Sequence, residues 1–116
     1  MSIAVNVDDL PAAIAARPWA YLLTVGDDGR SHLLAAVPTW RNATLLVAAG
    51  KRTRDNAARQ PSVALVYPPV DAPGETSSYS LIVDAEASLE GDVIVLHPTR
   101  AVLHRPAIPP AAQKNP

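Results

Sequence analysis

Short apolar runs separated by turn residues set the strongest limit on how this chain can fold. Six runs occur in 116 residues, at 20–25, 31–40, 44–49, 62–67, 78–91 and 92–97. The segments between them are rich in Gly, Pro, Asp and Asn, as in "GDDGR" at 26–30, and favour tight hairpins. Several runs are apolar without alternation, which is typical of strands covered on both faces. We therefore expect a mainly antiparallel β-barrel or sandwich, with a second subunit as the natural cover.

One or two short helices are expected beside the strands. Residues 8–16 begin with aspartates that can cap a helix, and residues 53–60 form a second helix that Pro61 stops. One further helical turn is expected at 99–104. Pro38 indicates an edge or a bulge near the end of the second strand, because proline cannot donate to a ladder.

Length and charge bound the class of protein. We expect one domain over 1–106 and a flexible proline-rich tail over 107–116. The net charge is −1 and cysteine is absent, so a basic nucleic-acid or membrane binder and thiol chemistry are disfavoured. The first residues do not read as a signal peptide, and no run is long enough to span a bilayer. A cytoplasmic protein is the expectation.

Reactive side chains form no recognisable constellation. The three histidines, His32, His97 and His104, lie in separate elements without metal-ligand spacing. No serine lies in a G-x-S-x-G context, and no P-loop or G-x-G-x-x-G occurs. We therefore expect no catalytic side chain and no metal site, so that any enzymatic chemistry comes from a bound cofactor.

A basic cluster follows the third strand in "AAGKRTRDNAARQP", residues 48–61. A turn entering a helix offers unpaired N–H groups and a positive dipole end, where Lys51, Arg52 and Thr53 suit a phosphate. The spacing also fits a solvated basic helix, which is the more common outcome. Arg54 fits either interpretation, and Arg59 is expected to be solvated, one turn or more further on.

The order of these motifs resembles the pyridoxamine 5′-phosphate oxidase-like, FMN-binding split barrels. "YLLTVGDDGRSHLLAAVPTW" is similar to their first hairpin, and "GKRTRDNAARQPSVALVY" to their basic turn, helix, proline and fourth strand. "YSLIVDAEAS" resembles the long fifth strand, and "VIVLHPTRAVLHRP" the closing strand of compact actinobacterial-type members. The resemblance covers residues 18–106.

The resemblance implies a homodimeric, six-stranded antiparallel split β-barrel with cofactor grooves at the subunit interface. It implies that FMN, or the deazaflavin coenzyme F420, places its phosphate at Lys51, Arg52 and Thr53. The ring would lie along the second strand, on which the implied cofactor-binding residues are His32, Leu33, Leu34, Ala35, Ala36 and Val37. Trp40, near the end of that strand, is either core or groove lining.

Three departures from the family pattern bear on the activity. Ser31 replaces a common proline, Ala85 replaces a common glycine, and the arginine- and histidine-bearing extension that holds pyridoxal phosphate is missing. Vitamin B6 oxidation is therefore not expected.

Three functions remain open. The first is a flavin- or deazaflavin-dependent oxidoreductase that moves a hydride to or from a small planar substrate. The second is a non-catalytic carrier of such a cofactor or of another anionic planar ligand. A nucleic-acid-binding barrel ranks third, because the basic segment carries no stacking ring.

Overall fold

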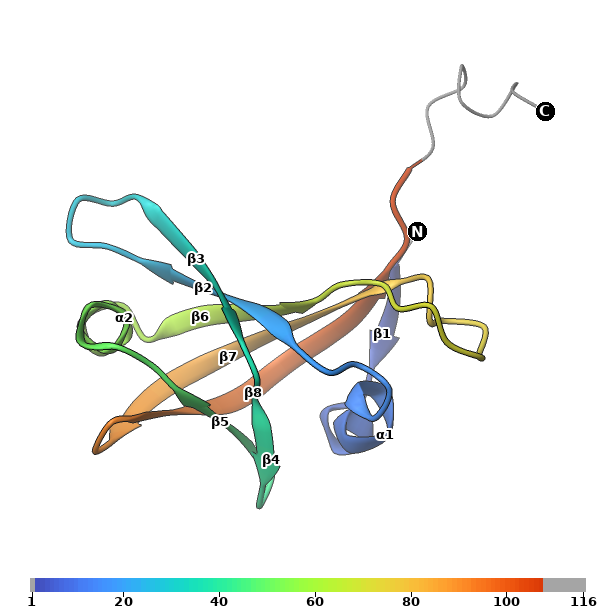
Figure 1. The fold of residues 1–116 in the computed structure, drawn as a ribbon, viewed down its shortest axis with the longest axis horizontal. Helices are drawn as coiled ribbons and strands as arrows, with labels where there is room; N and C mark the ends of the chain where they lie inside the picture. The colour runs from blue at the N-terminus through green and yellow to red at the C-terminus, as the bar shows by residue number, and fades with distance from the viewer. Residues whose placement is uncertain (1, 108–116) are drawn as a thin grey trace.

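Eight β-strands and two short α-helices make up residues 2–107, the part of the chain that the computed structural model describes (Figure 1). The strands are β1 (Ser2–Val5), β2 (Ala20–Val25), β3 (Ser31–Ala36), β4 (Thr39–Arg41), β5 (Thr44–Ala48), β6 (Ser62–Tyr67), β7 (Ser80–Glu90) and β8 (Val93–His104). The helices are α1 (Leu10–Ile14), entered through a 3₁₀ turn at Val7–Asp9, and α2 (Lys51–Arg59). The prediction of a mainly β fold with two short helices is confirmed.

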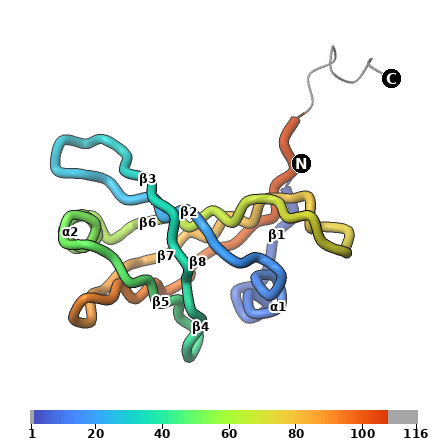
Figure 2. The backbone as a smooth tube through the Cα atoms, in the orientation of Figure 1, coloured from blue at the N-terminus to red at the C-terminus, as the bar shows by residue number. Residues whose placement is uncertain are grey.

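The strands form one antiparallel sheet that curls on itself. Seven of them follow the order β3-β2-β6-β7-β8-β5-β4, and β1 pairs with β8 outside this path. The two edge strands, β3 and β4, are separated in sequence only by Val37 and Pro38. A sheet whose opposite edges are two residues apart along the chain must curl until those edges meet at a corner (Figure 2). The result is an open, curled half-barrel, as the split-barrel expectation requires.

The strand count differs from the six expected, for two reasons. Pro38 divides the expected run 31–40 into β3, which pairs with β2, and β4, which pairs with β5. Residues 2–5 form β1, a strand that no strong local pattern announces, against the far half of β8. Counting β3 and β4 as one bent segment restores six strands, and β1 is the addition.

The last strand also corrects an expectation. Residues 93–104 are one continuous strand, so the helical turn expected at 99–104 is wrong. The register against β7 shifts between Asp84 and Ala85, a bulge that accommodates Pro98, which has no N–H to donate to the ladder. Beyond the bulge, β1 and β7 pair with β8 on either side, and this pairing outweighs the local preference for a turn.

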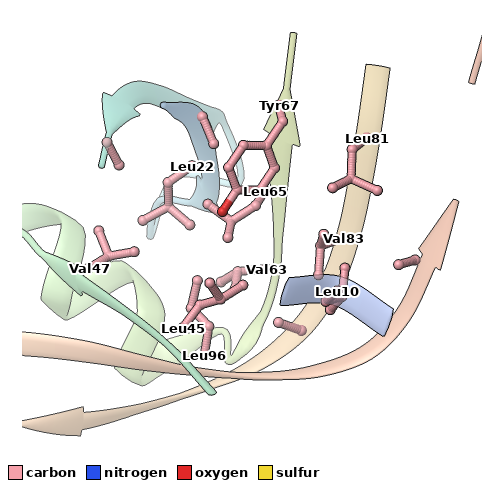
Figure 3. Packing of buried hydrophobic residues seen from close by; sticks show 14 of the residues in the cluster. Leu10, Leu22, Leu45, Val47, Val63, Leu65, Tyr67, Leu81, Val83 and Leu96 are labelled. Atoms are coloured by element: carbon pink, nitrogen blue, oxygen red, sulfur yellow. The ribbon is translucent and has the colours of Figure 1, made fainter. Parts of the chain in front are cut away.

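The inner face of the half-barrel carries the core. Leucine, valine and alanine from most strands meet there with Leu10 of α1, and the largest buried side chain is Tyr67 (Figure 3). The Tyr67 hydroxyl is buried without a hydrogen-bond partner among the described residues. Burial raises the pKa of Tyr67 to about 12, because ionisation would place a charge in the apolar interior.

The outer face of the same sheet carries apolar side chains around β2 and β3 that a single chain leaves uncovered. Leu33 is 58% exposed and Val37 72% exposed, and Tyr21 is also exposed. The second copy of the chain that is expected to pack on these residues is still a prediction.

A buried arginine joins α1 to the segment 68–79 between β6 and β7. The Arg17 guanidinium donates hydrogen bonds to the carbonyl oxygens of Pro68 at 3.2 Å, Thr76 at 2.9 Å and Tyr79 at 2.7 Å. Its Nε also donates to the Ala13 carbonyl at 3.2 Å. Burial lowers the pKa of Arg17 from its ordinary value, and four backbone carbonyls accept from the guanidinium.

Two expectations concern parts of the chain at or beyond the described limits. The proline-rich tail, predicted to be flexible over 107–116, lies outside the described residues from residue 108 onward. Within residues 2–107, no helix is both long and apolar enough to cross a membrane.

Candidate cofactor site

The basic segment forms the start of α2, at the end of the barrel opposite to α1 (Figure 1). The helix begins at Lys51, two residues before the expected start, so Lys51, Arg52 and Thr53 make up its first turn. Its N-cap is Gly50, which offers no side chain to accept from the first-turn N–H groups. These groups and the positive end of the helix dipole are therefore available to an anion.

The side chains of this turn have different surroundings. Arg52 is exposed, and no hydrogen bond or ion pair to its guanidinium is found within residues 2–107. The Lys51 ammonium lies 2.7 Å from the Asp55 carboxylate, and this hydrogen bond is the main cause of the lowered pKa of Asp55. Thr53 is buried on the face of α2 that turns to the barrel.

The other two arginines of the segment make hydrogen bonds close to α2. The half-buried Arg54 donates through Nη1 to the carbonyl of Ala49, two residues before the helix, at 2.6 Å. Arg59 was expected to be only solvated, but although exposed it donates through Nη2 to Asn56 Oδ1 at 3.0 Å. Of the three arginines on α2, Arg52 is thus the one without a partner in the part of the chain that the structure describes.

Strand β3, the predicted platform for the ring, is an edge strand. It pairs with β2 alone among the described strands, so backbone groups along its second edge have no ladder partner. Leu33 and Ala35 are exposed on its outer face, as is Val37 just after its end. His32 and Leu34 are half-buried and Ala36 is buried on its inner face. An open edge of this kind can hydrogen-bond a flat polar ligand.

His32 lies against the β2–β3 turn. A Cβ added at Gly26 would lie 2.8 Å from His32 Nε2, so the imidazole occupies the space that a side chain at residue 26 would need. The turn itself needs Gly29, whose φ of +78° is in the left-handed region that favours glycine. Trp40, in contrast, is half-buried and packs against the core.

The structure connects α2 and β3 through the strand between them. Asn56 of α2 donates through Nδ2 to Thr24 Oγ1 of β2 at 3.2 Å, and Thr24 is the register partner of His32 on β3. Neither Thr24 nor Asn56 is among the sequence-predicted site residues. One polar residue in the run "AYLLTV" is the single signal that could have indicated Thr24.

A groove of about 390 Å³ lies elsewhere, on the outer face of the sheet. Leu23 and Val25 form its apolar side, Asp84 and Glu86 form its acidic side, and Ser62 lies between them. The Ser62 hydroxyl donates to Glu86 at 3.0 Å, and Arg100 lies 3.9 Å from Asp84. The groove contains none of the predicted site residues. Across residues 2–107, no group of three or more histidine or acidic side chains could hold a metal ion.

Two mycobacterial proteins are similar to this chain in sequence. No protein-family model matches it. One uncharacterized protein of Mycobacterium bovis and one of Mycobacterium tuberculosis are each 38% identical to it over 130 aligned residues, which cover 96% of the chain and 89% of each relative.

Solved structures share its fold. An F420 reductase matches with a TM-score of 0.63 and 19% identity over 78% of the chain and 94% of that protein. A predicted pyridoxamine 5′-phosphate oxidase of Listeria innocua matches with a TM-score of 0.66 and 21% identity, over 84% and 96%. An FAD-binding protein of Mycobacterium smegmatis matches with a TM-score of 0.60 and 16% identity, over 90% and 100%. At these identities the likeness establishes the fold alone.

Proposed function

Since the chain belongs to the same family as the two mycobacterial proteins and is a split barrel of the pyridoxamine 5′-phosphate oxidase-like type, we propose that it is an oxidoreductase using FMN or the deazaflavin F420. The observation that carries the proposal is the first turn of α2. Its cap residue, Gly50, has no side chain to accept the first N–H groups, and its Arg52 has no partner among the described residues.

The phosphate of the cofactor binds at this turn. Backbone N–H groups and the helix dipole supply the neutral part of the site, and the Arg52 guanidinium supplies a planar pair of donors. Lys51 contributes a second charge once it exchanges Asp55 for the phosphate. Thr53, which faces the barrel, contributes through its backbone N–H, because its side chain is largely buried.

The ring of the cofactor lies along the free edge of β3. Backbone groups there meet the polar edge of the ring, while Leu33, Ala35 and Val37 supply apolar contact. When bound, a flavin or deazaflavin supplies the hydride chemistry, and the chain binds and orients it. No side chain is required as a covalent nucleophile.

A second copy of the chain completes the site. Support comes from the apolar outer face of the sheet, which a single chain leaves exposed at Tyr21, Leu33 and Val37. Contiguous apolar surface of this kind marks an interface with another protein. A twofold dimer in which β3 faces the partner would exclude water from the ring.

The alternative is a non-catalytic carrier of the same cofactor. The observation that favours it is that, across residues 2–107, no group of three or more histidine or acidic side chains could hold a catalytic metal ion. A carrier needs the binding elements above and nothing more.

Visible spectroscopy of the purified protein tests both proposed functions, the oxidoreductase and the non-catalytic carrier. We expect FMN or F420 to bind with a shifted visible absorption spectrum, and the reduced cofactor to be reoxidised by members of a panel of quinones, enones and nitro compounds. A bound cofactor that no member reoxidises would support the carrier. Absence of binding to either cofactor would overturn the proposal.

A further inference from the structure

The face by which α2 packs on the barrel is small and largely polar. Its buried residues are Thr53, Asn56 and Ala57, and no leucine, isoleucine, valine or aromatic residue occurs in the helix. Surface helices are ordinarily held by a stripe of larger apolar side chains, which fixes their rotation about their own axis. Burial of one alanine and parts of two polar side chains fixes α2 far less firmly.

A single buried hydrogen bond supplies what the apolar contact lacks. Asn56 is 3% exposed and Thr24 is 1% exposed, and Asn56 Nδ2 donates to Thr24 Oγ1 at 3.2 Å. The other end of the same amide accepts from Arg59 at 3.0 Å. A buried amide that lost its partner would carry an unsatisfied donor, so the helix would have to shift to hydrate it.

We propose that Thr24 and Asn56 are positioning residues that aim the first turn of α2 at the cofactor phosphate. This inference rests on the proposed function. Arg52 and Asn56 are four residues apart and therefore neighbours on the helix surface, so a rotation that releases Asn56 also moves Arg52. Because Thr24 is the register partner of His32, the same bond fixes α2 relative to the β2–β3 hairpin. The phosphate end and the ring end of the site are thereby held in one geometry.

Two substitutions at one position separate the hydrogen bond from the shape of the side chain. Thr24→Val keeps the branched shape and removes the acceptor, whereas Thr24→Ser keeps the hydroxyl. Each variant is titrated with FMN and with riboflavin, which has the same ring without the phosphate. If F420 is the tighter ligand, F420 and its phosphate-free chromophore replace this pair.

We expect Thr24→Val to weaken FMN binding about fivefold or more and to leave riboflavin binding unchanged, since one hydrogen bond of ordinary strength corresponds to roughly this factor. Thr24→Ser should restore most of the lost FMN affinity. Leu103→Ala is the control for a general loss of stability, because Leu103 is a core residue of β8. It should lower the melting temperature without changing the ratio of FMN to riboflavin affinity.

Hydrogen exchange of backbone amides tests the inference without a cofactor. In Thr24→Val the N–H groups of Arg54 and Gln60, bonded to the carbonyls of Gly50 and Asn56, should exchange about fivefold faster relative to those of β7. A Thr24→Val protein with the wild-type ratio of affinities overturns the inference, whatever its melting temperature. If the wild type binds neither cofactor, the proposed function fails, and unchanged exchange in α2 would overturn the coupling independently.

Discussion

The ammonium of Lys51 and the carboxylate of Asp55 lie 2.7 Å apart across one turn of α2, with both side chains largely exposed. The helix thus carries its own anion beside the place where the cofactor phosphate would bind. An incoming phosphate has to compete with Asp55 for Lys51 and is repelled by the same carboxylate.

Asp55→Asn should therefore tighten FMN binding, by about twofold to fivefold, the range expected for an exposed charge pair. The gain should shrink as salt is added, because exposed charges are screened. Isothermal titration calorimetry at two salt concentrations measures the change in FMN affinity. Asp71→Asn removes an equal, exposed charge from the segment 68–79 and should change the affinity little. Equal effects of the two substitutions would show that only the net charge matters.

Arg52→Ala should weaken FMN binding by about 1.5–3 kcal/mol, the scale of a charge-assisted hydrogen bond. Fluorescence titration measures the change. Arg59 is expected to matter less, but it is a poor control because it donates to Asn56. Arg41→Ala is the better one, since Arg41 is exposed and pairs with Glu90. Similar losses for Arg41 and Arg52 would show that the phosphate does not bind at α2.

Tyr67→Phe should change how stability depends on alkaline pH. The folded pKa of about 12 lies above the ordinary value of 10.0, so the stability linked to the neutral phenol is fully present below pH 10. It is lost as the pH rises from 10 to 12, and amounts to roughly 2–3 kcal/mol at 1.36 kcal/mol per pH unit. Urea unfolding across this range should show a shallower fall for Tyr67→Phe.

At neutral pH the same substitution should cost little or should stabilise, because the hydroxyl that it removes is buried without a partner among residues 2–107. A loss of more than about 2 kcal/mol at pH 7 would reveal a hydrogen bond to the Tyr67 hydroxyl, such as one from a buried water.

Tyr21→Glu should dissociate the proposed dimer. Tyr21 lies on the outer face of β2, 37% exposed, and a carboxylate there would be buried without a partner in the interface. Sedimentation velocity should show a dimer for the wild type and a monomer for the variant. Leu89→Glu places the same charge on an exposed apolar residue near the β7–β8 turn and should leave the dimer intact. A monomeric wild type would refute the expected assembly.

Local pattern was enough to predict the central strands. The apolar runs at 20–25 and 62–67 coincide with β2 and β6, because each is bounded by turn residues or proline. The far half of β8 was not predictable in this way. Proline at residue 98 indicates an end, and the strand continues because both β7 and β1 pair with its far half, β1 from almost a hundred residues away in sequence.

The candidate site, too, could be predicted only in part from the sequence. The proposed phosphate-binding role of Lys51 and Arg52 follows from residue chemistry and from their place at the start of a helix. The contact between Thr24 and Asn56 joins residues 32 apart with no motif between them, so only the curling of the sheet brings it about.

The bend at Val37 and Pro38 interrupts the hydrogen-bonded wall of the barrel. The segment from β3 to β4 completes the perimeter, yet its two halves are hydrogen-bonded to different neighbours, β2 and β5. At the bend, β3 and β4 are joined by the peptide chain and not by a ladder of hydrogen bonds. Substitutions at Val37 and Pro38 therefore change the angle between β3 and β4 without removing a residue from any hydrogen-bonded strand pair.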